Sequence, residues 1–133
     1  MKFYTLEAAN ANVDLLQKTF DHLATLYKLI TDLKNDSYVV LWEREKNHNK
    51  HYGKDDGLDL NQLELNRIIN QIEDLIDPII QKGIIVRDIK KGLVDIPSFK
   101  DGRIIYLCWV SGETEVSFWH EIDAGFSLSL IHI

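Results

Sequence analysis

Hydrophobic side chains in the first part of the chain recur every three or four residues. The series follows an a/d heptad pattern for more than three heptads and comprises Leu6, Ala9, Val13, Leu16, Phe20, Leu23, Tyr27 and Ile30. Thr5 precedes it as a helix N-cap. The pattern predicts a short strand over residues 1–4 and one long helix over residues 6–46. Asn35-Asp36-Ser37 leaves open whether that helix continues past Lys34.

A second apolar series follows a polar stretch. Residues 47–57 have no hydrophobic period and contain two glycines, which favours a connector. The next series predicts a second helix over residues 58–82 and comprises Leu58, Leu65, Ile68, Ile72, Leu75 and Ile79. Gly83 suits the position just after its end. Two long amphipathic helices joined by a polar loop predict an antiparallel αα-hairpin with coiled-coil character.

The hydrophobic period changes to two after Gly83, which predicts a small, mainly antiparallel β-sheet over residues 83–133. Asp101-Gly102 is a strong hairpin signal. Residues 103–110 and 115–122 are the clearest strands. The expected fold is therefore α+β: a single domain over residues 1–133, in which a long αα-hairpin precedes the sheet.

Hairpin register assigns side chains to the two faces of this sheet. The Asp101-Gly102 turn places Asp95 opposite Cys108, and a four-residue loop over 111–114 places His120 opposite Ile105. The face that we expect against the helices, the inner face, carries Ile105, Leu107, Trp109 and His120. The other, the outer face, carries Asp95, Tyr106, Cys108, Trp119 and Glu121. A loop of odd length would reverse strand 115–122, because a one-residue slip exchanges the faces.

Composition narrows the class of protein. The 133 residues include 15 basic and 21 acidic side chains, a formal charge of -6, so we expect no nucleic-acid partner. No apolar run is long enough to span a bilayer, and the first residues lack the apolar core of a signal peptide. A lone cysteine, Cys108, excludes an internal disulfide and suits a reducing compartment. These features predict a cytoplasmic protein.

Several segments resemble a prokaryotic family of small uncharacterised proteins catalogued as a domain of unknown function. They are Phe3-Tyr4-Thr5-Leu6-Glu7-Ala8-Ala9-Asn10, Gly92-Leu93-Val94-Asp95-Ile96-Pro97, Asp101-Gly102-Arg103 with Tyr106-Leu107-Cys108-Trp109, and Trp119-His120-Glu121-Ile122-Asp123-Ala124-Gly125-Phe126. Relatives continue after this last phenylalanine with a small residue and Gly-Arg-Gln-Pro, whereas this chain continues with Ser127-Leu128-Ser129-Leu130. The resemblance implies a fold and no reaction.

Asp95, His120, Glu121 and Asp123 are the candidate catalytic residues. Imidazole and carboxylate groups are typical of acid–base catalysis. His120, Asp95 and Asp123 are also candidate ligands of a divalent metal such as zinc, iron or manganese. His120 and Glu121 are neighbours on a strand and point to opposite faces. The alternative is a structural histidine at the edge of the core, held by a carboxylate or a carbonyl.

Two further features bear on function. Cys108 lies mid-strand among apolar residues with no adjacent cation, which favours a structural thiol over a nucleophile. Tyr106, Trp119 and Phe99 are candidate interface residues, because an aromatic patch on the outer face would mark a protein contact. The alternative is that another segment covers them.

The leading functional hypothesis is a protein-interaction module that associates with itself, as a dimer, and has no catalytic activity. A helix of 40 residues is about 60 Å long, more than a small sheet can cover, so its apolar stripe needs a second helix or another chain. The alternative hypothesis is a small metal-dependent or acid–base enzyme that uses Asp95, His120, Glu121 and Asp123.

Overall fold

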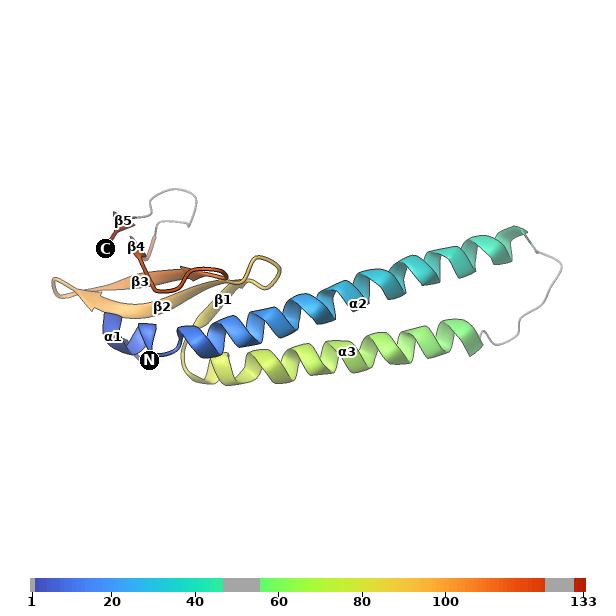
Figure 1. The fold of residues 1–133 in the computed structure, drawn as a ribbon, viewed down its shortest axis with the longest axis horizontal. Coiled ribbons are helices and arrows are strands. Elements are labelled where there is room, and N and C mark those ends of the chain that lie inside the picture. Colours follow the sequence, from blue (N-terminus) through green and yellow to red (C-terminus); the bar gives the residue numbers. More distant parts are fainter. Residues whose placement is uncertain (1, 47–55, 124–130) are drawn as a thin grey trace.

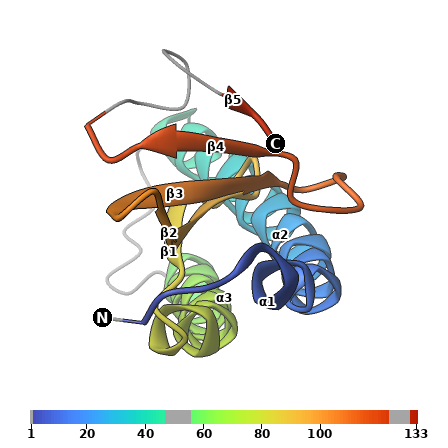
Figure 2. The same cartoon turned by 90° about the vertical axis from the view of Figure 1, so that its left-hand side faces the viewer.

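The computed structural model describes residues 2–46, 56–123 and 131–133, and the side chains of residues 2–33, 62–123 and 131–133. In the described part, the helices lie on one side of an antiparallel sheet (Figure 1, Figure 2). The elements in chain order are α1 (Leu6–Asn10), α2 (Val13–Lys46), α3 (Asp56–Gln81), β1 (Ile85–Asp88), β2 (Leu93–Lys100), β3 (Arg103–Val110), β4 (Phe118–Glu121) and β5 (Ile131–His132). The predicted α+β class is confirmed. None of these helices is both long and apolar enough to cross a bilayer.

The predicted helix over residues 6–46 is interrupted after Asn10, so the expectation of one continuous helix is wrong. Thr5 caps α1 as expected, because its hydroxyl accepts a hydrogen bond from a first-turn backbone N–H at 3.1 Å. The Asn10 side chain then accepts from the Val116 N–H at 2.6 Å, which ties α1 to the connection between β3 and β4. The Asn12 carbonyl accepts the first backbone bond of α2. The break therefore arises from contacts distant in sequence.

α2 and α3 contact each other and share one core with the inner face of the sheet. α2 continues through Asn35–Ser37 to Lys46. Of the predicted connector, residues 47–55 lie outside the described residues, and the last two belong to α3. The buried side chains of the two helices are Val13, Leu16, Phe20, Leu23 and Leu26 of α2, with Ile68, Ile72, Ile76 and Ile79 of α3. These positions are members or neighbours of the apolar series found in the sequence.

The end of α3 confirms the role expected of Gly83. Its φ of 79° lies in the left-handed region that favours glycine. The Gly83 N–H donates to the Ile80 carbonyl at 2.9 Å, and the Ile84 N–H donates to the Ile79 carbonyl at 3.3 Å. This pair of bonds is the Schellman motif, which satisfies carbonyls at the helix end and turns the chain toward β1.

The sheet has the strand order β1-β2-β3-β4-β5, and every neighbouring pair is antiparallel. Asp101 and Gly102 both have positive φ, 52° and 78°, as a two-residue turn of type I′ requires. The register that this turn predicts between β2 and β3 is confirmed, since Asp95 faces Cys108. The expected alternation is also observed, because inner-face residues of both strands join the core that the helices cover.

The predicted register between β3 and β4 is wrong by one residue. His120 faces Tyr106 and Trp119 faces Leu107, so the two side chains exchange the faces expected for them. β4 begins only at Phe118, and an odd number of residues (109–117) separates its first pair with β3. The physical reason is that the residues before β4 do not pair with β3. The N–H of Val116 donates instead to the Asn10 side chain of α1.

The segment before α1 does not form the strand predicted over residues 1–4, within the described residues 2–4. It nevertheless lies alongside β2, next to residues of β2 that do not pair with β1. The Tyr4 N–H donates to the Pro97 carbonyl at 2.8 Å, and the Ser98 hydroxyl donates to the Tyr4 carbonyl at 2.5 Å. These bonds hold α1 against the inner face.

Gly92 and Gly102 have similar backbone conformations, but only Gly92 is closely packed, against Ser111 and against Phe20 of α2. Replacing each with alanine therefore tests this packing. Gly92 and Gly102 have φ of 72° and 78°, so alanine costs each about 1 kcal/mol in strain. A Cβ at Gly92 would also lie 2.5 Å from the Cβ of Ser111 and 3.3 Å from the Phe20 ring, whereas at Gly102 it would meet nothing. We expect Gly92→Ala to lower the free energy of unfolding by about 2 kcal/mol more than Gly102→Ala, in urea titrations. Equal losses would contradict this packing.

Candidate functional site

Three ionisable side chains from three strands meet on the outer face of the sheet. Asp95 of β2 lies between Arg87 of β1 and His120 of β4. The Arg87 Nε is 2.8 Å from Asp95 Oδ2, and the His120 Nε2 is 2.9 Å from Asp95 Oδ1. Asp95 and His120 lie on opposite sides of β3. Asp95 is paired with Cys108 and His120 with Tyr106, two residues away on the same face, so His120 reaches Asp95 across β3. The one-residue shift of β4 therefore creates this cluster.

The cluster is buried at its histidine end and open to solvent at its arginine end. The side chains of His120 and Asp95 are 3% and 5% exposed, whereas that of Arg87 is 45% exposed. The Tyr106 ring packs against both partners of Asp95, with its centroid 5.5 Å from that of the His120 ring and 5.4 Å from the Arg87 guanidinium carbon. The hydrogen bond to Asp95 raises the pKa of Arg87, despite an opposing effect of burial.

Two contacts hold the His120 ring in place. The Nδ1 lies 2.8 Å from the Glu121 carbonyl, which only accepts, so this nitrogen donates. The Nε2 lies 2.9 Å from Oδ1 of Asp95, within hydrogen-bond distance. Both ring nitrogens therefore have partners within the protein.

In this arrangement the reactive groups of His120 and Asp95 are bound within the protein. Both ring nitrogens of His120 and both carboxylate oxygens of Asp95 have partners within the protein. A metal requires a neutral imidazole with a free lone pair, and an acid–base catalyst requires a nitrogen that reaches the substrate. Among the residues that the structure describes, no group of three His, Cys, Asp or Glu side chains is placed to hold a metal ion.

The other two predicted site residues lie apart from this cluster. Glu121 is on the opposite face of β4, where it accepts hydrogen bonds of 2.6–3.1 Å from the Arg103 guanidinium. These bonds lower the pKa of Glu121, which is partly exposed. Asp123 is exposed in the turn that follows β4. The structure thus brings together His120 and Asp95 of the four predicted residues.

Cys108 is buried beside the cluster. Burial raises the pKa of its thiol to about 12, and the negative charges of Asp95 and Glu113 add to the effect. The thiol is therefore neutral at physiological pH, and nothing near it favours a reactive thiolate.

The aromatic patch predicted on the outer face is not formed. Trp119 lies on the inner face opposite Leu107, so its predicted position is wrong for the same reason as that of His120. Tyr106 is buried between Arg87 and His120. Phe99 is exposed, and its ring packs on Phe3 with the centroids 4.3 Å apart. The three predicted interface residues therefore have three different environments.

Sequence reasoning missed Arg87. It is the only cationic side chain in β1, and β1 is joined to β2 by the short turn that contains Gly92. Pairing β1 with β2 would have placed a cation beside Asp95. The exact position also depends on a register irregularity between Val86 and Asp88, which no sequence signal marks.

The buried contact between His120 and Asp95 predicts a large effect of removing His120. His120→Ala leaves Asp95 buried with one partner fewer, and we expect the free energy of unfolding to fall by about 3 kcal/mol. Glu121→Gln is the matched control, because its ion pair with Arg103 is exposed and we expect a much smaller loss. Urea titration followed by circular dichroism measures both. A similar, small loss for both variants would contradict the structural role of His120.

The environment of Cys108 predicts slow thiol chemistry. At pH 8 we expect the native protein to react with a disulfide reagent at least about 100-fold more slowly than the chain in denaturant, because the buried thiol is not ionised. Since the folded pKa is raised from 9.0 to about 12, stability is fully present below pH 9 and is lost as the pH rises toward 12. Rapid labelling of the native protein would contradict the burial of this residue.

One comparison with known proteins found a relationship. A family model described as "Uncharacterized conserved protein (DUF2203)" matches residues 2–128. Comparisons with curated proteins and with solved structures gave no match.

Proposed function

This chain belongs to the DUF2203 family of uncharacterised conserved proteins, and we propose that it is a self-associating protein-interaction module without catalytic activity. The observation that carries the proposal is the helical arm, defined as the parts of α2 and α3 that extend beyond the sheet. Figure 1 shows this arm leaving one end of the sheet. We further propose that α2 and α3 form a long antiparallel αα-hairpin along the whole arm.

The lengths of the elements support this proposal. α2 has 34 residues and is about 51 Å long, whereas the eight-residue strands β2 and β3 span about 26 Å. The sheet therefore covers only part of α2. In the part of the chain that the structure describes, α2 and α3 contact each other, and two amphipathic helices alone bury only part of their apolar surface.

Exposed apolar side chains occur on both helices in addition to the buried ones. Leu29 of α2 is 45% exposed and Leu63 of α3 is 64% exposed. The others are Leu15 and Tyr27 of α2, with Ile69 and Ile80 of α3. Leu15 and Leu29 are two heptads apart, and Ile69 and Ile80 are three helical turns apart, so each pair lies on one face of its helix. Regular apolar rows of this kind are typical of helix–helix contacts.

A second copy of the chain is the partner that these rows favour. Two arms packed side by side form a four-helix bundle, in which the same surface of each copy meets its symmetry equivalent. Burying the exposed leucines and isoleucines removes apolar area from water at about 25 cal/mol per Å². A dimer, in the cytoplasm as the composition predicts, is therefore the proposed state.

The alternative of a metal-dependent or acid–base enzyme has less support. The groups of His120 and Asp95 that would react are bound to each other, to Arg87 and to the Glu121 carbonyl. A saturated cluster of this kind stabilises a particular pairing of strands. We therefore assign it a structural role in this proposal.

Light scattering after size-exclusion chromatography tests the dimer. We expect the wild-type mass to be twice that of the chain at about 50 µM, and Leu29→Glu to weaken the dimer at least about 100-fold by placing a charge in the contact. Thr31→Glu is the matched control, because Thr31 is also exposed on α2 but lies on another side of the helix, and we expect this variant to remain dimeric.

Circular dichroism establishes that both variants are folded. A monomeric wild-type protein, or equal weakening by both substitutions, would contradict the proposal.

A further inference from the structure

A groove of about 450 Å³ lies on the inner face of the sheet, at the end away from the helical arm. Its floor is formed by Ile105 and Leu107 of β3 with Trp119 of β4, which belong to the buried core. Leu6 of α1 and His132 of β5 also line the groove, and Thr5 and Ser98 add polar groups to it. The volume lies within the range of about 300–1,000 Å³ that is usual for small-molecule sites.

The groove arises because α1 is short. α1 has five residues and covers only part of the inner face at this end, whereas α2 and α3 lie toward the other end (Figure 1). The shifted register of β4 then directs Trp119, instead of His120, to the same face as Leu107. A large aromatic ring and two aliphatic side chains therefore form an apolar floor, which suits a hydrocarbon chain.

Lys100 also lines this groove and carries a positive charge. Its Nζ lies 5.5 Å from the centroid of the Trp119 ring, within the range of a cation–π contact. Arg103 also lies over this ring, at 5.9 Å, but Glu121 neutralises it. Among the residues that the structure describes, Lys100 has no carboxylate within salt-bridge distance.

The local charge contrasts with that of the whole chain. The protein has a net charge of -6. Lys100, which lies beside the apolar floor, is nevertheless positively charged. An ammonium group next to apolar surface pairs favourably with an anion, because water is partly excluded there. The combination therefore favours a ligand with one anionic end and one apolar end.

We propose that this groove binds a small amphipathic carboxylate, with its hydrocarbon chain on Ile105, Leu107 and Trp119 and its carboxylate paired with Lys100. Each buried methylene strengthens binding about four-fold, so a chain of about ten carbon atoms is long enough for micromolar affinity. Decanoate is the simplest probe of this class. The lining residues do not include Leu29 or the other exposed apolar residues of α2 and α3, so the site does not depend on self-association.

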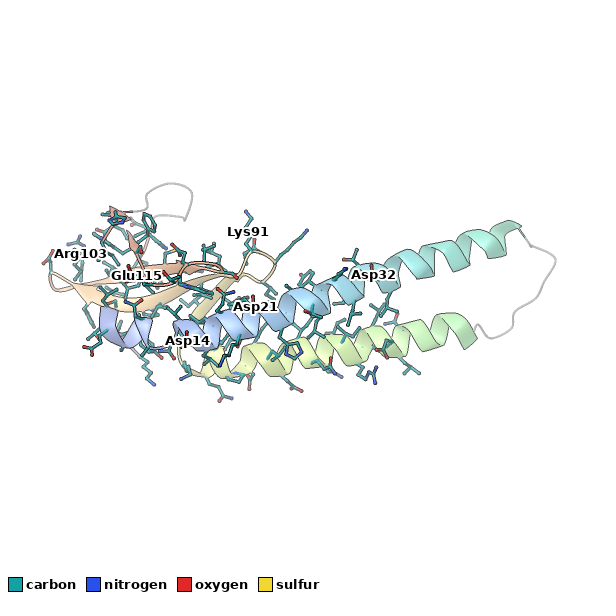
Figure 3. All side chains as sticks on the ribbon, in the orientation of Figure 1. Asp14, Asp21, Asp32, Lys91, Arg103 and Glu115 are labelled. Atoms are coloured by element: carbon teal, nitrogen blue, oxygen red, sulfur yellow. The ribbon has the colours of Figure 1, made fainter. Side chains whose placement is uncertain are left out.

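Isothermal titration calorimetry with decanoate, below the concentration at which it forms micelles, tests the site. We expect a Kd of about 10 µM, and binding at least about 10-fold weaker for Lys100→Gln. Lys91→Gln is the matched control, because Lys91 is exposed at the β1–β2 turn (Figure 3), far from Arg103 and the groove, and we expect its Kd to equal that of the wild type. Decanol, which has the same chain without the charge, should bind at least about 10-fold more weakly than decanoate.

Amide chemical shifts in NMR spectra locate the ligand. We expect the changes to concentrate at Lys100, Leu107 and Trp119, and the monomeric Leu29→Glu variant to bind decanoate as the wild type does. Absence of binding at millimolar decanoate, equal affinity for decanol, or an unchanged Kd for Lys100→Gln would overturn the proposal. Shifts that concentrate on the helical arm around Leu29 would also overturn it.

Discussion

The pairing of β4 with β3 is the constraint on which both faces of the sheet depend. In the observed register Tyr106 faces His120 and Leu107 faces Trp119. A slip of one residue would remove the imidazole from Asp95 and place it in the apolar core, and would remove the indole from the inner face. Because a buried imidazole without hydrogen-bond partners is destabilising, the contact between Asp95 and His120 penalises that slip. One contact across β3 therefore helps to select the strand register.

The two faces that this register creates differ in what they leave free. On the outer face, Asp95 binds both Arg87 and His120, so each of its carboxylate oxygens has a partner within the protein. On the inner face, the short α1 leaves apolar side chains beside Lys100 at one end of the sheet. A group that is already paired can stabilise a fold, whereas binding requires groups whose pairing is incomplete. This difference is why we assign stability to one face and binding to the other.

The helices and the sheet also divide the molecule along its length. The core that joins them includes Leu16 and Phe20 of α2 and the Trp109 ring of β3, which lies 6.0 Å from that of Phe20. Beyond this core, the arm extends in one direction (Figure 1), whereas the residues that line the groove belong to α1, β5 and the strands of the sheet. The proposed surface for a second copy and the proposed site for a small ligand therefore do not compete for the same residues.

The sequence by itself determined the features that depend on neighbouring residues. Its three- and four-residue periods located the helices, and the change of period at Gly83 located the sheet. The Asp101-Gly102 turn correctly set the register of β2 against β3, because a two-residue turn of type I′ leaves little freedom in pairing. Only the tertiary structure decided the break after Asn10 and the register of β4, since both involve the contact of Asn10 with Val116, which lies 106 residues away. Asp95 and His120 could be named as candidates from the sequence. Their contact, and that of Arg87 with Asp95, depends on how three strands pack together, which local patterns do not encode.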